Sequence, residues 1–122
     1  MELHESGEMY LETILIVKNR FGYARSIDIA NEMNVSKPSV SRAVGLLKEN
    51  GYITFDPNGM ILLTKQGKEV AEKIYERHQV LTQYLTSIGV SEETAARDAC
   101  KIEHVISDET FSIIKQMLFE NK

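Results

Sequence analysis

Two short helical segments with strong boundary signals constrain the fold of this chain more than any other feature. Residues 27–33 have the apolar spacing of a short helix, and a second helical segment follows after a two-residue turn. Ser36 is a favourable N-cap for the second segment, and Pro38 stands in its first turn, where a missing N–H costs little. Gly51 marks its end, because glycine readily adopts the left-handed conformation that ends many helices. The pattern predicts a helix-turn-helix.

A hairpin signal follows directly. Residues 52–55 and 60–63 are rich in strand-forming side chains, and Asn58-Gly59 between them is a strong turn signal. Two helices, a short turn and a hairpin in this order predict a winged helix, in which the second helix enters the DNA major groove and the hairpin lies against the backbone.

Helical patterns occupy the remainder of the chain. Helices are predicted over residues 8–20 and 65–87, from residue 91 to about 106, and from residue 108 to about 118. The fold class is therefore mainly α with a small β-hairpin wing, and we expect a domain boundary near residue 68, which gives units of residues 1–68 and 69–122.

Composition narrows the location and the partners. The 122 residues include one cysteine, no signal peptide, and no apolar run near the roughly 20 residues of a spanning helix, so we expect a cytoplasmic protein that does not contact membranes. The net charge of −4 argues weakly against nucleic-acid binding. Residues 36–48 nevertheless contain Lys37, Arg42 and Lys48 and no acidic residue, so the predicted reading helix is basic.

The start of that helix carries the candidate DNA contacts. Small hydroxyl side chains and a proline ring permit close approach to DNA, Arg42 can bind guanine or a phosphate, and Lys37 and Arg25 suit phosphates. The alternative is that the helix-turn-helix is only a packing unit. The predicted DNA-binding residues are Arg25, Ser36, Lys37, Pro38, Ser39, Ser41 and Arg42.

Potential metal donors gather near both ends of the chain. Cys100, Glu103 and His104 have the spacing of one helix face, and Met9 and Glu12 share another. Sulfur, imidazole and carboxylate donors together favour iron(II), cobalt(II), nickel(II) or zinc over magnesium or calcium, although zinc sites usually use more cysteines. Each residue alone has a simpler explanation, as a buried thiol, a core methionine or part of a solvated face.

Several motifs together resemble the iron- and manganese-dependent repressors of the diphtheria-toxin-repressor type, in a short form without the SH3-like domain. The resemblance covers nearly the whole chain. The segments that carry it are Glu8-Met9-Tyr10-Leu11, Ile29-Ala30, Ser36-x-Pro-Ser-Val-Ser41, Leu63-Thr64-x-x-Gly67-Lys68, Arg77-His78 and Cys100-x-x-Glu103-His104-Val105-x-Ser107.

The resemblance implies a ligand set and an assembly. Residues 1–68 would form the DNA-binding domain and residues 69–122 a metal-binding and dimerisation domain, so that a homodimer reads a palindromic operator. By this resemblance the primary site is Met9, Cys100, Glu103 and His104, and a second site includes Glu12 and His78. The chain departs from the iron branch at Thr82 and Ala96, where that branch has a carboxylate and a histidine. It therefore resembles a hybrid of the two branches.

The predicted function is a metal-activated transcriptional regulator, most simply a repressor of metal uptake or homeostasis genes. Iron(II) is the first choice of metal because of the soft donors, and manganese(II) is the second. The alternative is a metal-independent regulator that senses redox state or a small molecule through Cys100. An enzyme is not expected, because no independent nucleophile, general base or phosphate loop stands at a suggestive spacing.

Overall fold

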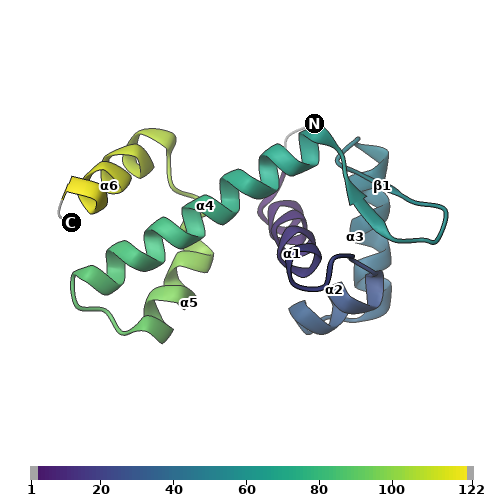
Figure 1. The fold of residues 1–122 in the computed structure, drawn as a ribbon, viewed down its shortest axis with the longest axis horizontal. Helices are drawn as coiled ribbons and strands as arrows, with labels where there is room; N and C mark the ends of the chain where they lie inside the picture. Colours follow the sequence, from purple (N-terminus) through teal and green to yellow (C-terminus); the bar gives the residue numbers. More distant parts are fainter. Residues whose placement is uncertain (1–2, 121–122) are drawn as a thin grey trace. The chain divides into compact units, whose positions relative to one another are not determined.

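The computed structural model describes residues 3–120, which fold into helices and one β-hairpin (Figure 1). This confirms the predicted fold class. The chain forms two compact units, Met1–Glu72 and Lys73–Lys122. The elements are α1 (Glu5–Phe21), α2 (Ser26–Met33), α3 (Lys37–Glu49), β1 (Ile53–Phe55), β2 (Ile61–Leu63), α4 (Lys65–Ser87), α5 (Glu92–Ile102) and α6 (Asp108–Glu120).

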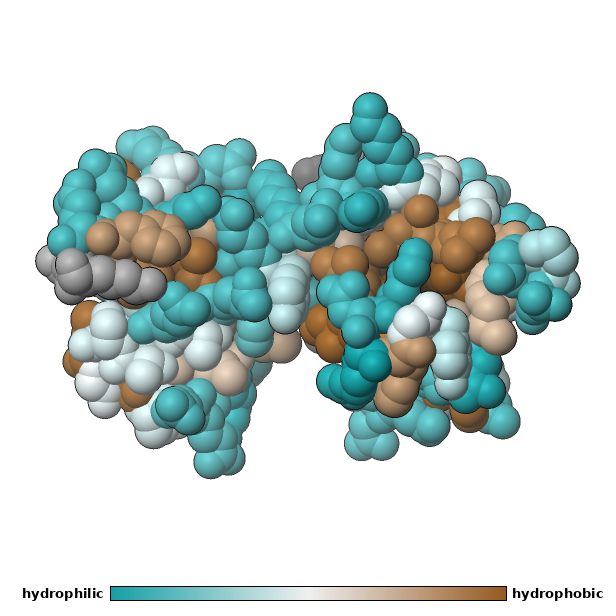
Figure 2. Space-filling view, viewed as in Figure 1, coloured by the Kyte–Doolittle hydropathy of each residue, from teal (hydrophilic) through white to brown (hydrophobic). Residues whose placement is uncertain are grey.

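The first unit is built around the contacts of α1 with α2 and α3. Leu11 and Ile14 on α1 are fully buried, as are Ile29 on α2 and Val40 on α3. Figure 2 shows the face of the molecule in this view, with hydrophobic residues in brown and hydrophilic residues in teal. The burial of the apolar side chains supplies the main driving force for the unit, at about 1.5–3 kcal/mol for each large aliphatic side chain.

The reading helix α3 begins and ends where its cap residues predict. The Ser36 hydroxyl accepts a hydrogen bond from the backbone N–H of Ser39 at 3.2 Å. At the other end Gly51 has a φ of 84°, a left-handed conformation that favours glycine. The predicted helix-turn-helix boundaries at these residues are confirmed.

The wing is a short antiparallel hairpin. Ile53 pairs with Leu63 and Phe55 with Ile61. The Asp56 carboxylate accepts hydrogen bonds from the backbone N–H groups of residues 58 and 60, at 2.8 and 2.9 Å, and so holds the connecting turn. The backbone N–H of Ile61 also donates to the carbonyl of Ala24 at 2.8 Å, which attaches the hairpin to the segment before α2.

The start of α4 is fixed by a cap and a close approach. The Thr64 hydroxyl accepts from the Gly67 N–H at 3.1 Å and donates to the Gly51 carbonyl at 2.7 Å. A Cβ atom at Gly67 would lie 2.0 Å from the Tyr52 carbonyl oxygen, so only glycine fits there. The predicted helix over residues 65–87 is confirmed, and the boundary between the two units falls within it.

In the second unit, Val80 from α4 forms an apolar core with Phe111 and Leu118 from α6. α5 ends at Ile102, four residues earlier than predicted, and residues 103–105 form a turn. The Ser107 hydroxyl then caps α6 by accepting from the Thr110 N–H at 3.1 Å. Among the helices of residues 3–120, none combines the length and apolar character needed to cross a membrane.

Candidate metal centre and nucleic-acid interface

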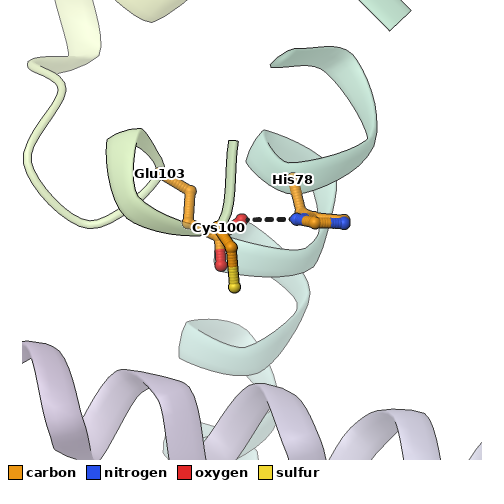
Figure 3. Close-up of side chains that lie close together, drawn as sticks. All are labelled: His78, Cys100 and Glu103. Carbon is orange, nitrogen blue, oxygen red and sulfur yellow. Dashed lines mark hydrogen bonds and ion pairs between the residues drawn. The ribbon is translucent and has the colours of Figure 1, made fainter. Parts of the chain in front are cut away.

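The second unit brings His78, Cys100 and Glu103 together. One ligand atom from each side chain lies within 4.8 Å of the others. Figure 3 shows Cys100 and Glu103 projecting from the end of α5, with the Glu103 carboxylate directed to His78 on α4. Ligand atoms around one transition-metal ion lie roughly 3 to 4 Å apart, so small side-chain movements would complete such a set.

Glu103 is the central residue of this cluster. Its side chain is completely buried, and its Oε2 lies 2.8 Å from Nδ1 of His78. Its Oε1 lies 3.2 Å from Nε2 of His104, yet within the described residues no hydrogen bond reaches that oxygen. Burying a carboxylate with an oxygen that accepts no hydrogen bond is costly unless a cation offsets the charge.

The donor set fits a divalent transition metal. Imidazole, thiolate and carboxylate together match the borderline and soft preferences of such ions better than those of magnesium or calcium. Cys100 and His78 are partly exposed, so an ion could reach them from solvent.

The structure places the predicted donors of the second unit on α4 and at the end of α5. The sequence analysis placed Cys100, Glu103 and His104 on one helix face, but α5 ends at Ile102 and the last two residues lie in the following turn. The sequence analysis assigned His78 to a second site and Glu103 to the primary site, and in the structure these two side chains are in contact. Spacing along the sequence gives no signal for this contact between α4 and the end of α5.

The two upstream candidates belong to the first unit. Met9 and Glu12 lie on the same helix, α1, where Met9 is half-buried and Glu12 is buried. Their roles as ligands, like the division into a primary and a second site, stay predictions.

The reading helix presents the expected groups to solvent. Lys37, Ser41 and Arg42 are exposed on α3, and Ser39 is half-buried. The exposed residues Ser36 and Pro38 complete the start of the helix. A basic, solvent-exposed helix N-terminus of this kind can approach a DNA backbone without a change in the fold of the first unit. The individual DNA contacts stay predictions.

Arg25 is held by a local ion pair that the sequence analysis missed. Its Nε and Nη2 donate to the two carboxylate oxygens of Asp28 at 3.0 and 3.1 Å. This hydrogen bonding raises the pKa of Arg25 and lowers the pKa of the Asp28 carboxyl. The Arg25 guanidinium also lies 5.2 Å from the centre of the Tyr23 ring. The signal that could have revealed the pair is the three-residue spacing of opposite charges at a helix start.

Comparison with known proteins settles the family. Residues 2–60 match the model of the iron-dependent repressor N-terminal DNA-binding domain, and residues 64–122 match the iron-dependent repressor metal-binding and dimerisation domain. The chain belongs to the iron-dependent repressor family. The resemblance seen in its motifs is thereby confirmed.

Relatives and solved structures agree with this membership. The chain is 38% identical over 102 residues to the HTH-type transcriptional regulator MntR of Geobacillus kaustophilus, covering 84% of this chain and 72% of the relative. It is 33% identical over 115 residues to the HTH-type transcriptional regulator MJ0568 of Methanocaldococcus jannaschii, covering 93% and 92% of the two chains.

Among solved structures, the manganese regulator SloR has a TM-score of 0.82 at 27% identity, and the T. acidophilum IdeR structure has a TM-score of 0.75 at 28% identity. The alignments cover 98% and 93% of this chain. The chain spans about half the length of those two structures, 55% and 52%. As a family member it is a metal-dependent transcriptional regulator with a DNA-binding and a dimerisation domain.

Proposed function

We propose that this chain is a cytoplasmic, metal-activated repressor that binds palindromic operator DNA as a homodimer. The observation that carries the proposal is the buried Glu103 carboxylate between His78 and Cys100, in a chain that also has a basic reading helix. A bound cation would offset the charge of this buried carboxylate, so metal availability can control the folded arrangement of the domain.

Each residue has a defined part in this proposal. Glu103 supplies negative charge in a dry position, His78 orients the carboxylate through its Nδ1, and Cys100 adds a sulfur donor. A bound metal supplies the positive charge that offsets the carboxylate. The ligands proposed from the family resemblance are Met9, Cys100, Glu103 and His104, with Glu12 and His78 for a second site.

Manganese(II) is the first candidate metal, because the solved relative SloR is described as a manganese regulator. The preference for iron(II) that the soft donors suggested receives no support from the comparisons with named proteins. Iron(II) stays the second candidate for one reason only, the Cys100 thiol in the cluster, since thiolate suits iron better than manganese. The metal-independent alternative is not favoured, because residues 64–122 match a metal-binding domain.

DNA binding is proposed for the start of α3. Lys37 and Arg42 would neutralise phosphates or reach a guanine. Arg25 would bind a phosphate, either after its ion pair with Asp28 breaks or while that ion pair is kept. Two such helices in a homodimer would read half-sites separated by about one helical turn of DNA, which accounts for the proposed palindrome.

The test is a selection from randomised duplex DNA, carried out anaerobically with manganese(II), with iron(II) and with a chelator. We expect a palindromic sequence to be enriched with one of the metals and its affinity to fall at least about tenfold when the chelator is added. Equal affinity with metal and with chelator would overturn the proposal. Cys100→Ser with retained metal response would favour manganese over iron.

A further inference from the structure

Arg77 is a buried cation next to the candidate metal centre that the proposed function does not use. It lies on α4 within the second unit, and only 6% of its surface is exposed. Its Nη1 donates to the carbonyl oxygen of Glu103 at 3.2 Å and to that of Ile106 at 2.8 Å. Its Nη2 forms an ion pair with Asp108, the first residue of α6. The guanidinium therefore spans the whole connection between α5 and α6.

The two carbonyl groups that Arg77 binds lie in this connection, after the end of α5. The last carbonyl groups of α5 accept from backbone N–H groups of residues 103–106, whereas the carbonyl groups of Glu103 and Ile106 accept from Arg77. The turn is also where the buried Glu103 carboxylate has to be held. A turn whose carbonyl groups were free to move would not keep that carboxylate in one place.

Two consecutive residues of α4 fix Glu103 from two sides. Arg77 binds its backbone carbonyl, and His78 binds its carboxylate at 2.8 Å. The side chain of the candidate metal ligand Glu103 and its backbone are thus both held by the same turn of α4. This is the arrangement expected of a support for a ligand rather than of a general surface ion pair.

Arg77 is itself locked in place. Asp108 accepts from Arg77 and also pairs with Lys73 at 3.3 Å. The hydrogen bond from Lys73, together with the charges of Lys73 and Arg77, lowers the pKa of the Asp108 carboxyl. The guanidinium lies 5.4 Å from the centre of the Phe111 ring, which belongs to the apolar core of this unit. The two Nη atoms of this planar guanidinium bind different partners, so a lysine at this position would lose some of these hydrogen bonds.

We infer that Arg77 is a positioning residue of the metal centre, which holds the Glu103 turn in the geometry that binds the ion. This inference rests on the proposed metal-dependent function. It assigns to Arg77 an effect on metal affinity and on coordination geometry, in addition to any effect on folding. Groups that orient metal ligands typically change metal affinity by roughly 10- to 100-fold when they are removed.

The experiment uses the full chain with cobalt(II) and manganese(II) as probes, under anaerobic and reducing conditions. The variants are Arg77→Gln, Arg77→Lys and Asp108→Asn. The matched control is Arg97→Gln, which removes an exposed arginine of α5 that pairs with Glu93 at 3.3 Å. Metal affinity, the cobalt(II) ligand-field spectrum, and thermal unfolding with and without metal are measured for each variant.

For Arg77→Gln we expect cobalt(II) affinity to fall about 10- to 100-fold and the ligand-field bands to shift, because the Glu103 turn is released. Arg77→Lys and Asp108→Asn should lie between this variant and the unchanged protein. Arg97→Gln should match the unchanged protein in both affinity and spectrum. In Arg77→Gln, the loss of stability on thermal unfolding should be larger with metal than without metal.

Three outcomes contradict the inference and leave the proposed function standing. Unchanged affinity and spectrum in Arg77→Gln would overturn it, and so would an equal loss of thermal stability with and without metal, which indicates a purely structural role. If Arg77→Gln does not fold, unchanged cobalt(II) binding in both Arg77→Lys and Asp108→Asn would overturn it. Absence of metal binding in the unchanged protein would instead overturn the proposed function itself, and the inference with it.

Discussion

The reading helix and the candidate metal centre of this protein are held in place by different kinds of interaction. In the first unit the candidate DNA contacts are exposed, and the helix that carries them packs through buried apolar side chains such as Val40 and Val44. In the second unit the candidate ligand Glu103 is itself buried, and its turn is held by hydrogen bonds from Arg77 and His78. Function and folding should therefore separate by mutation in the first unit and be coupled in the second.

The largest expected effect is the loss of metal binding in Glu103→Gln. The substitution keeps the size of the side chain but removes the buried negative charge, and we expect metal affinity to fall roughly 100-fold, or about 2.7 kcal/mol. Isothermal titration with manganese(II) measures it, with Glu93→Gln on the exposed face of α5 as the control. Wild-type affinity in Glu103→Gln would remove this residue from the site.

A second prediction tests the packing of the first unit. Gly67→Ala places a Cβ against the Tyr52 carbonyl and should lower the free energy of unfolding by about 2 kcal/mol. Gly45→Ala is the matched control, because space is open at that position and alanine is the better helix former. Urea unfolding distinguishes the two, and equal stability of both variants would show that the close approach at Gly67 is unimportant.

A third prediction separates DNA binding from folding. Arg42→Gln removes an exposed charge from α3 and should weaken DNA binding by about 1–2 kcal/mol. Unfolding and metal affinity should stay unchanged, since the side chain is exposed. Fluorescence anisotropy with the selected duplex provides the measurement. An equal fall in stability would contradict the proposed separation of function from folding in this unit.

The smallest expected effect concerns the ion pair of Arg25 and Asp28. The pKa of the Asp28 carboxyl is lowered in the folded protein, chiefly by the hydrogen bond from Arg25. The ion pair therefore stabilises the fold at pH values above 3.8, the ordinary pKa of this group. That contribution is lost as the pH falls through the lowered folded-state pKa. Asp28→Asn should therefore cost a few tenths of a kcal/mol at pH 6 and less at pH 3. Urea midpoints at the two pH values test this, and a difference that grows toward pH 3 would contradict it.

Local signals predicted the elements whose ends are determined locally. The Ser36 cap and Gly51 define α3, and Thr64 defines the start of α4, because the hydrogen bonds that end these helices come from neighbouring residues. The end of α5 was predicted four residues too late. The carbonyl of Glu103, the first residue after this helix, is bound by Arg77, which lies 26 residues away along the chain, and no local pattern reports such a contact.

The candidate site shows the same limit. The residue types of the cluster were found from the sequence, since sulfur, imidazole and carboxylate groups at short spacing are chemically informative. The contact of His78 with Glu103 was not found, because it depends on how α4 packs against the end of α5. Arg77 was noticed only as part of a family motif, and its contacts with two carbonyl groups required the structure.

The most direct test of the central claim is an anaerobic titration of the reduced protein with cobalt(II), followed by absorbance. If His78, Cys100 and Glu103 form the metal centre, a thiolate-to-metal band and ligand-field bands should appear together and saturate at an integral stoichiometry. The thiolate band should disappear in Cys100→Ser, and binding should weaken in Glu103→Gln. A spectrum like that of cobalt(II) in water, unchanged in both variants, would contradict the account.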